Sequence, residues 1–234
     1  KDFCRPLLVL RFHQRDCRSL WLYPKQSEND TAENTDATAG IFDQGGGFVK
    51  KLLIVVDYQK DFVNGALGFD GADKIDKGIA AKVLAKEYDA LVVTYDTHYE
   101  NYLETREGVQ LPIPHCIQGT DGHKLFGETA KAVEEVEDKK YVHTIYKETF
   151  ATSPADMVNL KIALQERFGE TVEEVEFTGL VTNMCVVSNV VAFQGAYPNA
   201  QMVVNADLVD SFNKDLHNKT LDVFEGMQVK VVNR

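Results

Sequence analysis

The sequence predicts an α/β fold: a mostly parallel, twisted sheet with helices on both faces, in three layers. Short apolar runs rich in β-branched residues alternate with segments whose apolar residues recur at helical spacing. The runs are apolar on both sides, as strands are when helices cover each face of the sheet. The chain has 234 residues, of which 44% are hydrophobic and 26% charged, so it can bury one substantial core.

The expected elements alternate regularly from residue 50 onward. A serine before a proline predicts the start of one helix at residue 154, and a glycine predicts its end after residue 168. A long loop is expected over 96–122, between the second strand and the next helix. Strands are predicted at 51–57, 90–95, 141–146, 174–181, 201–205 and 227–232, and helices at 74–88, 124–135, 154–168, from near residue 185, and at 214–224.

Residues 1–48 differ from the remainder of the chain. They contain a polar tract, SENDTAENTDATAG, and a run of three glycines, which have almost nothing to bury. We expect these residues to form a poorly ordered tail. The tail is either a disordered regulatory arm or a segment that the natural protein lacks, included because the start codon was assigned too far upstream. Residues 49–234 are then expected to form the functional domain.

Charge and cysteine content limit the expected partners. A net charge of -11 and a pI near 5.0 disfavour nucleic acid and anionic membranes, which leaves a small molecule or another protein. The four cysteines are irregularly spaced and form no CxxC pair, so a reducing cytoplasm is expected. No apolar run approaches the roughly 20 residues that span a bilayer. Homo-oligomer formation stays open.

Polar residues at the ends of the predicted strands mark the expected site, because ligands of parallel sheets bind beyond the carboxyl ends of the strands. Asp57 ends the first strand, although a lone aspartate there is more often a cap or turn former. Lys147 ends the third, where a lysine is usually a solvated charge. Asp96 and His98 follow the second strand, and with His115 they are sound ligands for a divalent zinc, iron or manganese ion.

Cys185 follows the fourth strand, within GLVTNMC. A thiol at a strand-to-helix junction lies near the positive end of the helix dipole, which favours a thiolate. Free cysteine is also among the most buried residue types, so a small core residue fits this stretch equally well. Asp57 and Lys147 on the same rim favour a nucleophile, because the aspartate could take the thiol proton and the sulfur could attack an amide carbonyl.

Four motifs in order, DYQKDF, DTH with a later PHC, KETF, and GLVTNMC, resemble the isochorismatase-like cysteine hydrolases, and most closely the nicotinamidases. The resemblance covers residues 49–234 and implies a Rossmann-like isochorismatase fold. It implies Asp57 as general base, Lys147 as third triad member and Cys185 as nucleophile. It further implies a cis peptide bond before Val181, an oxyanion hole formed by the amides of Val181 and Cys185, and a substrate pocket lined by Phe62.

The same resemblance implies a metal site and a reaction. Asp96, His98 and His115 match the metal triad of the family, with Glu107 as a further candidate ligand and Glu104 as its rival. The ion would hold the pyridine nitrogen of nicotinamide, which the enzyme would convert to nicotinate and ammonia through a cysteine thioester, as in NAD salvage. Hydrolysis of another small amide or carbamoyl compound, or a catalytically silent binding module, are the alternatives.

This chain departs from many nicotinamidases at two places. Leu111 to Pro114 stand where an aromatic residue is common before the second histidine, and Asn183 stands where an acidic residue is frequent. Both departures bear on the identity of the substrate more than on the chemistry.

Overall fold

The computed structural model describes residues 51–137, 141–169 and 172–234. The expectations about residues 1–48 lie outside this described part. Single-turn 3₁₀ elements span Ala72–Ile75 and Tyr102–Glu104, and a π-helical turn spans Thr182–Val186. The strands are β1 Lys51–Val56, β2 Ala90–Asp96, β3 Tyr141–Lys147, β4 Glu174–Leu180, β5 Gln201–Asp210 and β6 Lys230–Val232. The helices are α1 Lys60–Val63, α2 Asp76–Leu84, α3 Arg106–Gln110, α4 Gly127–Val136, α5 Pro154–Phe168, α6 Val187–Ala196 and α7 Lys214–Gly226.

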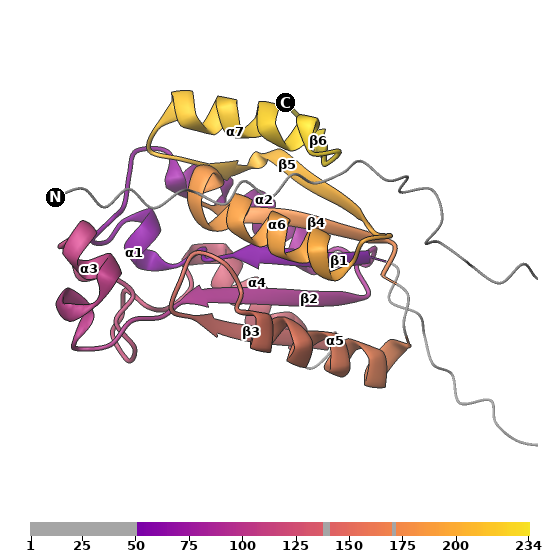
Figure 1. Cartoon of the computed structure of the whole chain (residues 1–234), viewed down its shortest axis with the longest axis horizontal. Helices are drawn as coiled ribbons and strands as arrows, with labels where there is room; N and C mark the ends of the chain where they lie inside the picture. The colour runs from indigo at the N-terminus through magenta and orange to yellow at the C-terminus, as the bar shows by residue number, and fades with distance from the viewer. Residues whose placement is uncertain (1–50, 138–140, 170–171) are drawn as a thin grey trace, which may run out of the picture. The chain divides into compact units, whose positions relative to one another are not determined.

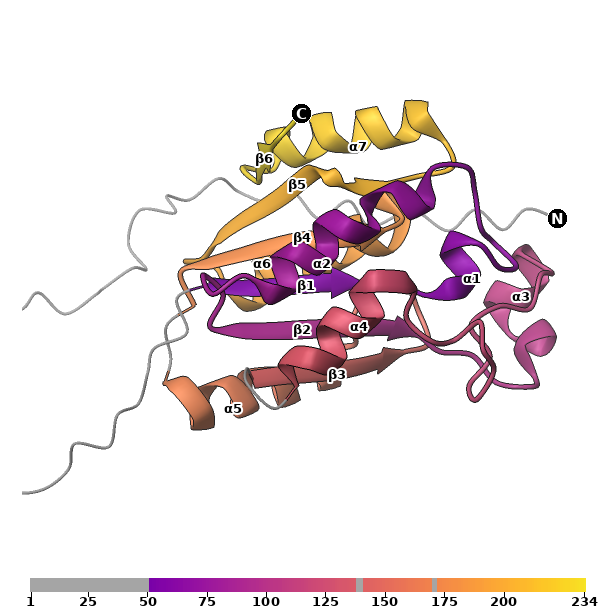
Figure 2. The same cartoon turned by 180° about the vertical axis from the view of Figure 1, so that it is seen from behind.

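The six strands form one sheet in the order β3-β2-β1-β4-β5-β6, and every neighbouring pair runs parallel. The first strand, β1, therefore lies in the middle of the sheet. β2 and β3 extend the sheet on one side of it, and β4, β5 and β6 extend it on the other. Helices α5 and α6 lie in front of the sheet in Figure 1, whereas α2 and α4 lie in front when the molecule is seen from behind in Figure 2. The predicted three-layer α/β fold is confirmed.

Two apolar cores fill the space between the sheet and its helices. Side chains of a strand alternate between faces, so Leu52 and Ile54 of β1 belong to the core under α5 and α6, together with Phe193. Leu53 and Val55 point the other way, into the core under α2 and α4. All four of these β1 side chains are fully buried. This burial on both sides explains why the strand reads as a continuous apolar run.

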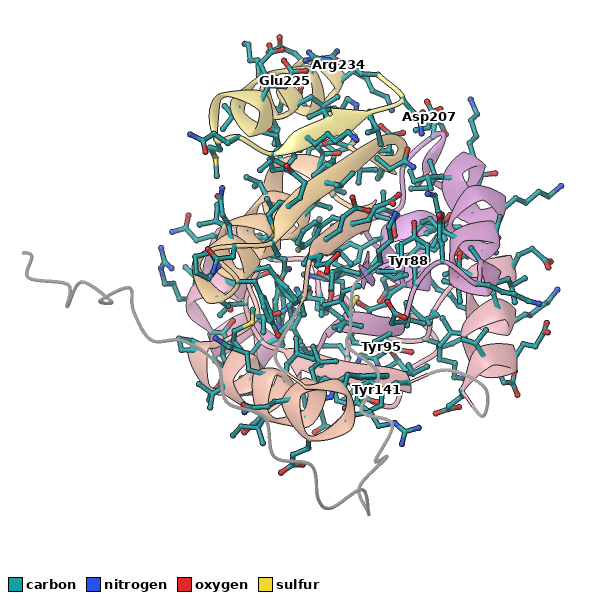
Figure 3. The ribbon with its side chains drawn as sticks, turned by 90° about the vertical axis from the view of Figure 1, so that its right-hand side faces the viewer. Tyr88, Tyr95, Tyr141, Asp207, Glu225 and Arg234 are labelled. Atoms are coloured by element: carbon teal, nitrogen blue, oxygen red, sulfur yellow. The ribbon has the colours of Figure 1, made fainter. Side chains whose placement is uncertain are left out.

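The middle of β4 carries a buried carboxylate that is structural. Glu176 accepts a hydrogen bond from the hydroxyl of Tyr88 at 2.6 Å and another from Asn205 Nδ2 at 3.2 Å, and Lys82 Nζ lies 3.1 Å from it. Tyr88 lies centrally when the molecule is viewed from the right-hand side of Figure 1 (Figure 3). Because its polar atoms are paired, this carboxylate needs no ligand.

Several element boundaries differ from the sequence prediction. The predicted helix 74–88 begins as a 3₁₀ turn and ends at Leu84, and the predicted loop 96–122 contains α3. β5 extends beyond the predicted range 201–205 to Asp210, because its pairing with β4 shifts register between Phe177 and Gly179 and resumes at Val209. Among the described residues, no helix has the length and apolar character needed to cross a membrane.

Gly179, near the end of β4, is required by a close approach of two backbones. Its φ is +106°, and a Cβ built there would lie 2.0 Å from the carbonyl oxygen of Val56 on β1. A side chain would therefore both strain the backbone and force β4 away from β1. This contact fixes the spacing of the two strands that lead to Asp57 and Cys185.

We predict that Gly179→Ala lowers the free energy of unfolding by about 2 kcal/mol or more. Urea denaturation of the purified protein measures this change. Gly195→Ala is the matched control, because Gly195 lies in α6 with no atom near the added methyl group, and the substitution is expected to stabilise by about 0.5–1 kcal/mol. Equal stability of both variants would contradict the assignment.

Candidate active site

The carboxyl ends of four strands meet at one edge of the sheet, on the left of Figure 1. Asp57 follows β1, Asp96 ends β2, Lys147 ends β3, and Cys185 lies in the turn after β4. Asp96 and Lys147 are direct partners in the register of β2 and β3. Asp57 is fully buried, and Lys147 and Cys185 are only 2% and 5% exposed. The structure thus brings the sequence-predicted triad together beneath the surface.

Lys147 joins the other members of this cluster. Its Nζ lies 2.6 Å from Asp57 Oδ2, 3.2 Å from Asp96 Oδ1 and 3.7 Å from Cys185 Sγ. It also donates a hydrogen bond to the carbonyl oxygen of Thr149 at 3.0 Å. One buried ammonium group therefore faces two carboxylates and a thiol, and it offsets part of the negative charge that the carboxylates bring into the interior.

The charges in this cluster shift one another's pKa values. Burial raises the pKa of Asp57, although the charge of Lys147 works in the opposite direction. Burial alone would lower the pKa of Lys147, but Asp57 and then Cys185 raise it well above its ordinary value. Burial also raises the pKa of the Cys185 thiol, against the lowering effect of Lys147. Burial thus works against the lowering of the Cys185 pKa that the sequence position led us to expect, and Lys147 is the group that opposes burial.

Asp57 is oriented by a residue that the sequence reading did not single out. Thr94 Oγ1 donates a 2.6 Å hydrogen bond to Asp57 Oδ1. Asp57 Oδ2 has no aligned hydrogen-bond donor in the described part of the chain, and its contact with Lys147 is an ion pair, so this oxygen can accept a proton. The backbone of Asp57 has φ 44°, in the left-handed region. A threonine inside a strand is ordinary, so no sequence signal marked Thr94.

The turn that carries Cys185 is wider than an α-helical turn. The Leu180–Val181 bond is cis, as the resemblance implies. Residues Thr182–Val186 then form a π-helical turn, and α6 begins only at Val187 rather than near Cys185. Hydrogen bonds from Val186 N to Val181 O (3.2 Å) and from Asn189 Nδ2 to Cys185 O (2.8 Å) close this turn.

The π-helical turn that carries Cys185 is also held by Ser211, which precedes α7, and by His217, which lies within α7. Thr182 Oγ1 lies 2.8 Å from His217 Nδ1, and Ser211 Oγ donates to Asn183 Oδ1 at 2.6 Å. Thr182 and Ser211 are fully buried. The sequence reading gave His217 no role, because nothing in the sequence shows that two positions 35 residues apart are in contact.

A group of metal-ligand side chains lies beside the triad. One potential ligand atom from each of four residues lies within 4.8 Å of the others: Asp96, His98, Glu107 and His115. Asp96 Oδ2 is 2.9 Å from His98 Nε2 and 3.3 Å from His115 Nε2. Glu107 Oε1 lies 3.7 Å and 3.8 Å from the same two nitrogens. Glu107 joins this group and Glu104 does not.

The ligand atoms are held in position by groups behind them. His115 Nδ1 lies 2.8 Å from the carbonyl oxygen of Ile113, so it carries the proton and leaves Nε2 free as a ligand. The side chain of Gln59 donates to the Asp96 carbonyl at 2.9 Å and accepts from the Asp96 amide at 2.8 Å. Two imidazoles and two carboxylates fit a divalent zinc, iron or manganese ion.

The other histidines in the described part of the chain lie outside this group. His123 Nε2 lies 2.9 Å from the hydroxyl of Thr97, and His143 lies 3.3 Å from the hydroxyl of Tyr141. His13 falls outside the described residues. Cys116, next to His115, is fully buried, and burial raises the pKa of its thiol, which suits a structural residue.

A cavity of about 560 Å³ opens over the cluster. Cys185, Asp96, Glu107, Gln110 and His115 supply its polar groups, and Phe62 and Val181 also line it. The ring of Phe62 packs edge to face against the ring of His115, with the two ring centres 5.5 Å apart. A small molecule in this cavity can reach the thiol and the metal-ligand group together.

Comparison with known proteins agrees with this geometry. The chain is 29% identical over 184 residues to the uncharacterised isochorismatase family protein PncA of Bacillus subtilis, an alignment that covers 75% of this chain and 94% of the relative. The crystal structure of nicotinamidase/pyrazinamidase PncA from Bacillus subtilis superposes with a TM-score of 0.68 at 29% identity, covering 78% of this chain and 98% of that one. The pyrazinamidase/nicotinamidase from Streptococcus mutans gives a TM-score of 0.67 at 29% identity, with coverage of 78% and 100%. Residues 51–234 match the isochorismatase domain, and the chain therefore belongs to the isochorismatase family.

Proposed function

We propose that this protein is an amidase that hydrolyses nicotinamide to nicotinate and ammonia. The observation that carries the proposal is the buried contact of Lys147 with both Asp57 and Cys185, directly beside a four-residue metal-ligand group. Relatives with 29% identity that are named nicotinamidases support the same substrate. This activity would belong to NAD salvage in the cytoplasm.

The first chemical step forms a covalent intermediate. Asp57 accepts the proton of the Cys185 thiol, and the sulfur attacks the carboxamide carbon. Lys147 remains cationic beside both groups, so it compensates the negative charge that passes from the carboxylate to the sulfur. The amides of Val181 and Cys185 donate hydrogen bonds to the carbonyl oxygen as it becomes negative.

The second step releases both products. The tetrahedral adduct collapses to a thioester, and the leaving nitrogen takes the proton from Asp57 and departs as ammonia. Asp57 then accepts a proton from a water molecule that attacks the thioester. The acid leaves as nicotinate once its own proton has passed to solvent, and the proton on Asp57 returns to the sulfur of Cys185. One water is consumed for each amide bond broken.

The metal-ligand group would serve binding and orientation. Asp96, His98, His115 and Glu107 would hold a divalent zinc, iron or manganese ion, which supplies a Lewis acid for the pyridine nitrogen when bound. Asp96 Oδ1 at the same time contacts Lys147, so the ligand group and the triad share one carboxylate. Phe62 packs against His115 and offers an aromatic face to the substrate ring.

We expect Cys185→Ala to abolish ammonia release from nicotinamide while the protein remains folded, because Cys185 supplies the only thiol among the described residues that line the cavity. A coupled ammonia assay together with circular dichroism checks both statements. Cys116→Ala is the matched control, since it removes a buried thiol outside the cluster and is expected to stay active. Full activity of folded Cys185→Ala would remove the nucleophile assignment.

The acid limb of the pH–rate profile is expected to move when Lys147 is replaced. Catalysis needs Asp57 ionised, and the charge of Lys147 lowers its pKa. Lys147→Met removes that effect, so the pKa of Asp57 rises and kcat/KM begins to fall at a higher pH, with a loss of about 100-fold or more at neutral pH. Lys147→Arg keeps the charge and should keep the limb near its original position. A shift of the Lys147→Met limb toward lower pH would contradict this account.

Removal of metal is expected to weaken nicotinamide binding by about tenfold or more, because the ring nitrogen loses its anchor. Calorimetric titration of the Cys185→Ala variant, before and after chelation and after readdition of zinc or manganese, measures binding without turnover. His115→Ala should reproduce the effect of chelation. Equal binding by verified metal-free protein would count against the metal role.

A further inference from the structure

The cavity over the cluster is larger than a single-ring substrate requires. A volume of about 560 Å³ lies within the range of roughly 300–1,000 Å³ in which proteins hold drug-sized ligands. Nicotinamide consists of one six-membered ring and a carboxamide. The polar groups that would hold it, on Cys185, Asp96 and His115, account for a small part of the lining. Most of the remaining wall is apolar, with Leu67, Phe69, Leu111, Phe150, Met184 and Phe212.

The amide end of the substrate cannot use this extra space. The leaving nitrogen must receive a proton from Asp57, so it has to face the triad. Asp57 is fully buried and Lys147 is 2% exposed, which closes this end of the site. A bulky group on the amide nitrogen would therefore have to displace buried, charge-paired side chains. Only the acyl part of a substrate can extend.

The apolar wall leads from the cluster to solvent. Phe62 lies at the inner end, against His115. Phe69 and Phe212 meet edge to face with ring centres 6.3 Å apart, and Phe212 is 60% exposed. Phe150, also in the wall, is 38% exposed. These exposed aromatic rings form an apolar mouth that a larger acyl group can cover.

The charges of the lining select against anionic acyl groups. No lysine or arginine is among the described residues that line this cavity, and its carboxylates are Asp96 and Glu107. Lys214 Nζ lies 5.8 Å from the ring centre of Phe69, but it is paired with Asp210 at 2.6 Å. A carboxylate on the substrate would leave water without meeting a cationic side chain among the described residues of this lining.

We propose that this site accepts primary carboxamides whose acyl part is an uncharged bicyclic heteroaromatic ring, and that it rejects both N-substituted amides and anionic acyl groups. The inference rests on the proposed function, since it uses the same thiol and the same proton path. The bond broken is again the amide C–N bond, with water consumed and ammonia released.

Three probes test the proposal on the metal-loaded 234-residue chain, and each is measured against nicotinamide. Quinoline-3-carboxamide keeps the carboxamide meta to the ring nitrogen, as in nicotinamide, and adds a fused ring. N-phenylnicotinamide places the added ring on the amide nitrogen, and 5-carbamoylpyridine-3-carboxylate adds a negative charge. We expect kcat/KM for quinoline-3-carboxamide to lie within about tenfold of the value for nicotinamide. For N-phenylnicotinamide and 5-carbamoylpyridine-3-carboxylate we expect kcat/KM to be at least about 100-fold below the value for nicotinamide.

A variant at the mouth tests the wall itself. Phe212→Ala is expected to lower the ratio of kcat/KM for quinoline-3-carboxamide to that for nicotinamide by about tenfold, mainly through KM. Phe212→Leu should restore part of the ratio. Val223→Ala is the matched control, because Val223 is an exposed apolar residue of α7 that does not line the cavity, and it should leave the ratio unchanged.

The outcomes separate the two proposals. Turnover of nicotinamide without turnover of quinoline-3-carboxamide overturns this inference and leaves the proposed function standing. Turnover of neither compound overturns the proposed function, and this inference with it. Preference for N-phenylnicotinamide or the carboxylate, or an unchanged ratio in Phe212→Ala, contradicts the assignment of the apolar mouth.

Discussion

The buried ion pair between Lys147 and Asp57 is the interaction on which the site depends. Without the ammonium group, two carboxylates would lie close together out of water, which is strongly unfavourable. The pair also requires that β1, β2 and β3 end at the same level, because its members come from different strands. The parallel register of these strands brings Lys147, Asp57 and Asp96 together, and the close approach of β4 to β1 adds Cys185 to the same charged cluster. Asp96 extends that arrangement to the metal-ligand group.

The fold and the position of the site followed from simple features of the sequence. Continuous apolar runs identify buried strands, and alternation with helices makes the strands parallel. The carboxyl ends of parallel strands meet at one edge, so Asp57, Lys147 and Cys185 were expected on one rim once the strands were assigned, and the strand order β3-β2-β1-β4 brings them into contact. The helix at Pro154–Phe168 was predicted to the residue, because Ser153 caps it and Gly169 ends it.

Other features had no local signal. The π-helical turn depends on contacts with α6 and α7, and the length of β5 depends on a register shift in its pairing with β4. Thr94, Gln59 and His217 act through partners far away in the sequence. Lysine is usually exposed, so the burial of Lys147 could be expected only from its place in the motif. The aromatic mouth likewise gathers side chains from separate loops, and no periodicity connects them.

The backbone of Asp57 has a consequence for how this position can vary. At φ 44°, aspartate and asparagine are tolerated far better than most other residues, because their short polar side chains form local hydrogen bonds. The left-handed backbone at position 57 therefore restricts which residue types fit there, independently of the need for a carboxylate in catalysis. Replacement by alanine combines loss of the carboxylate with backbone strain, whereas asparagine removes the negative charge alone.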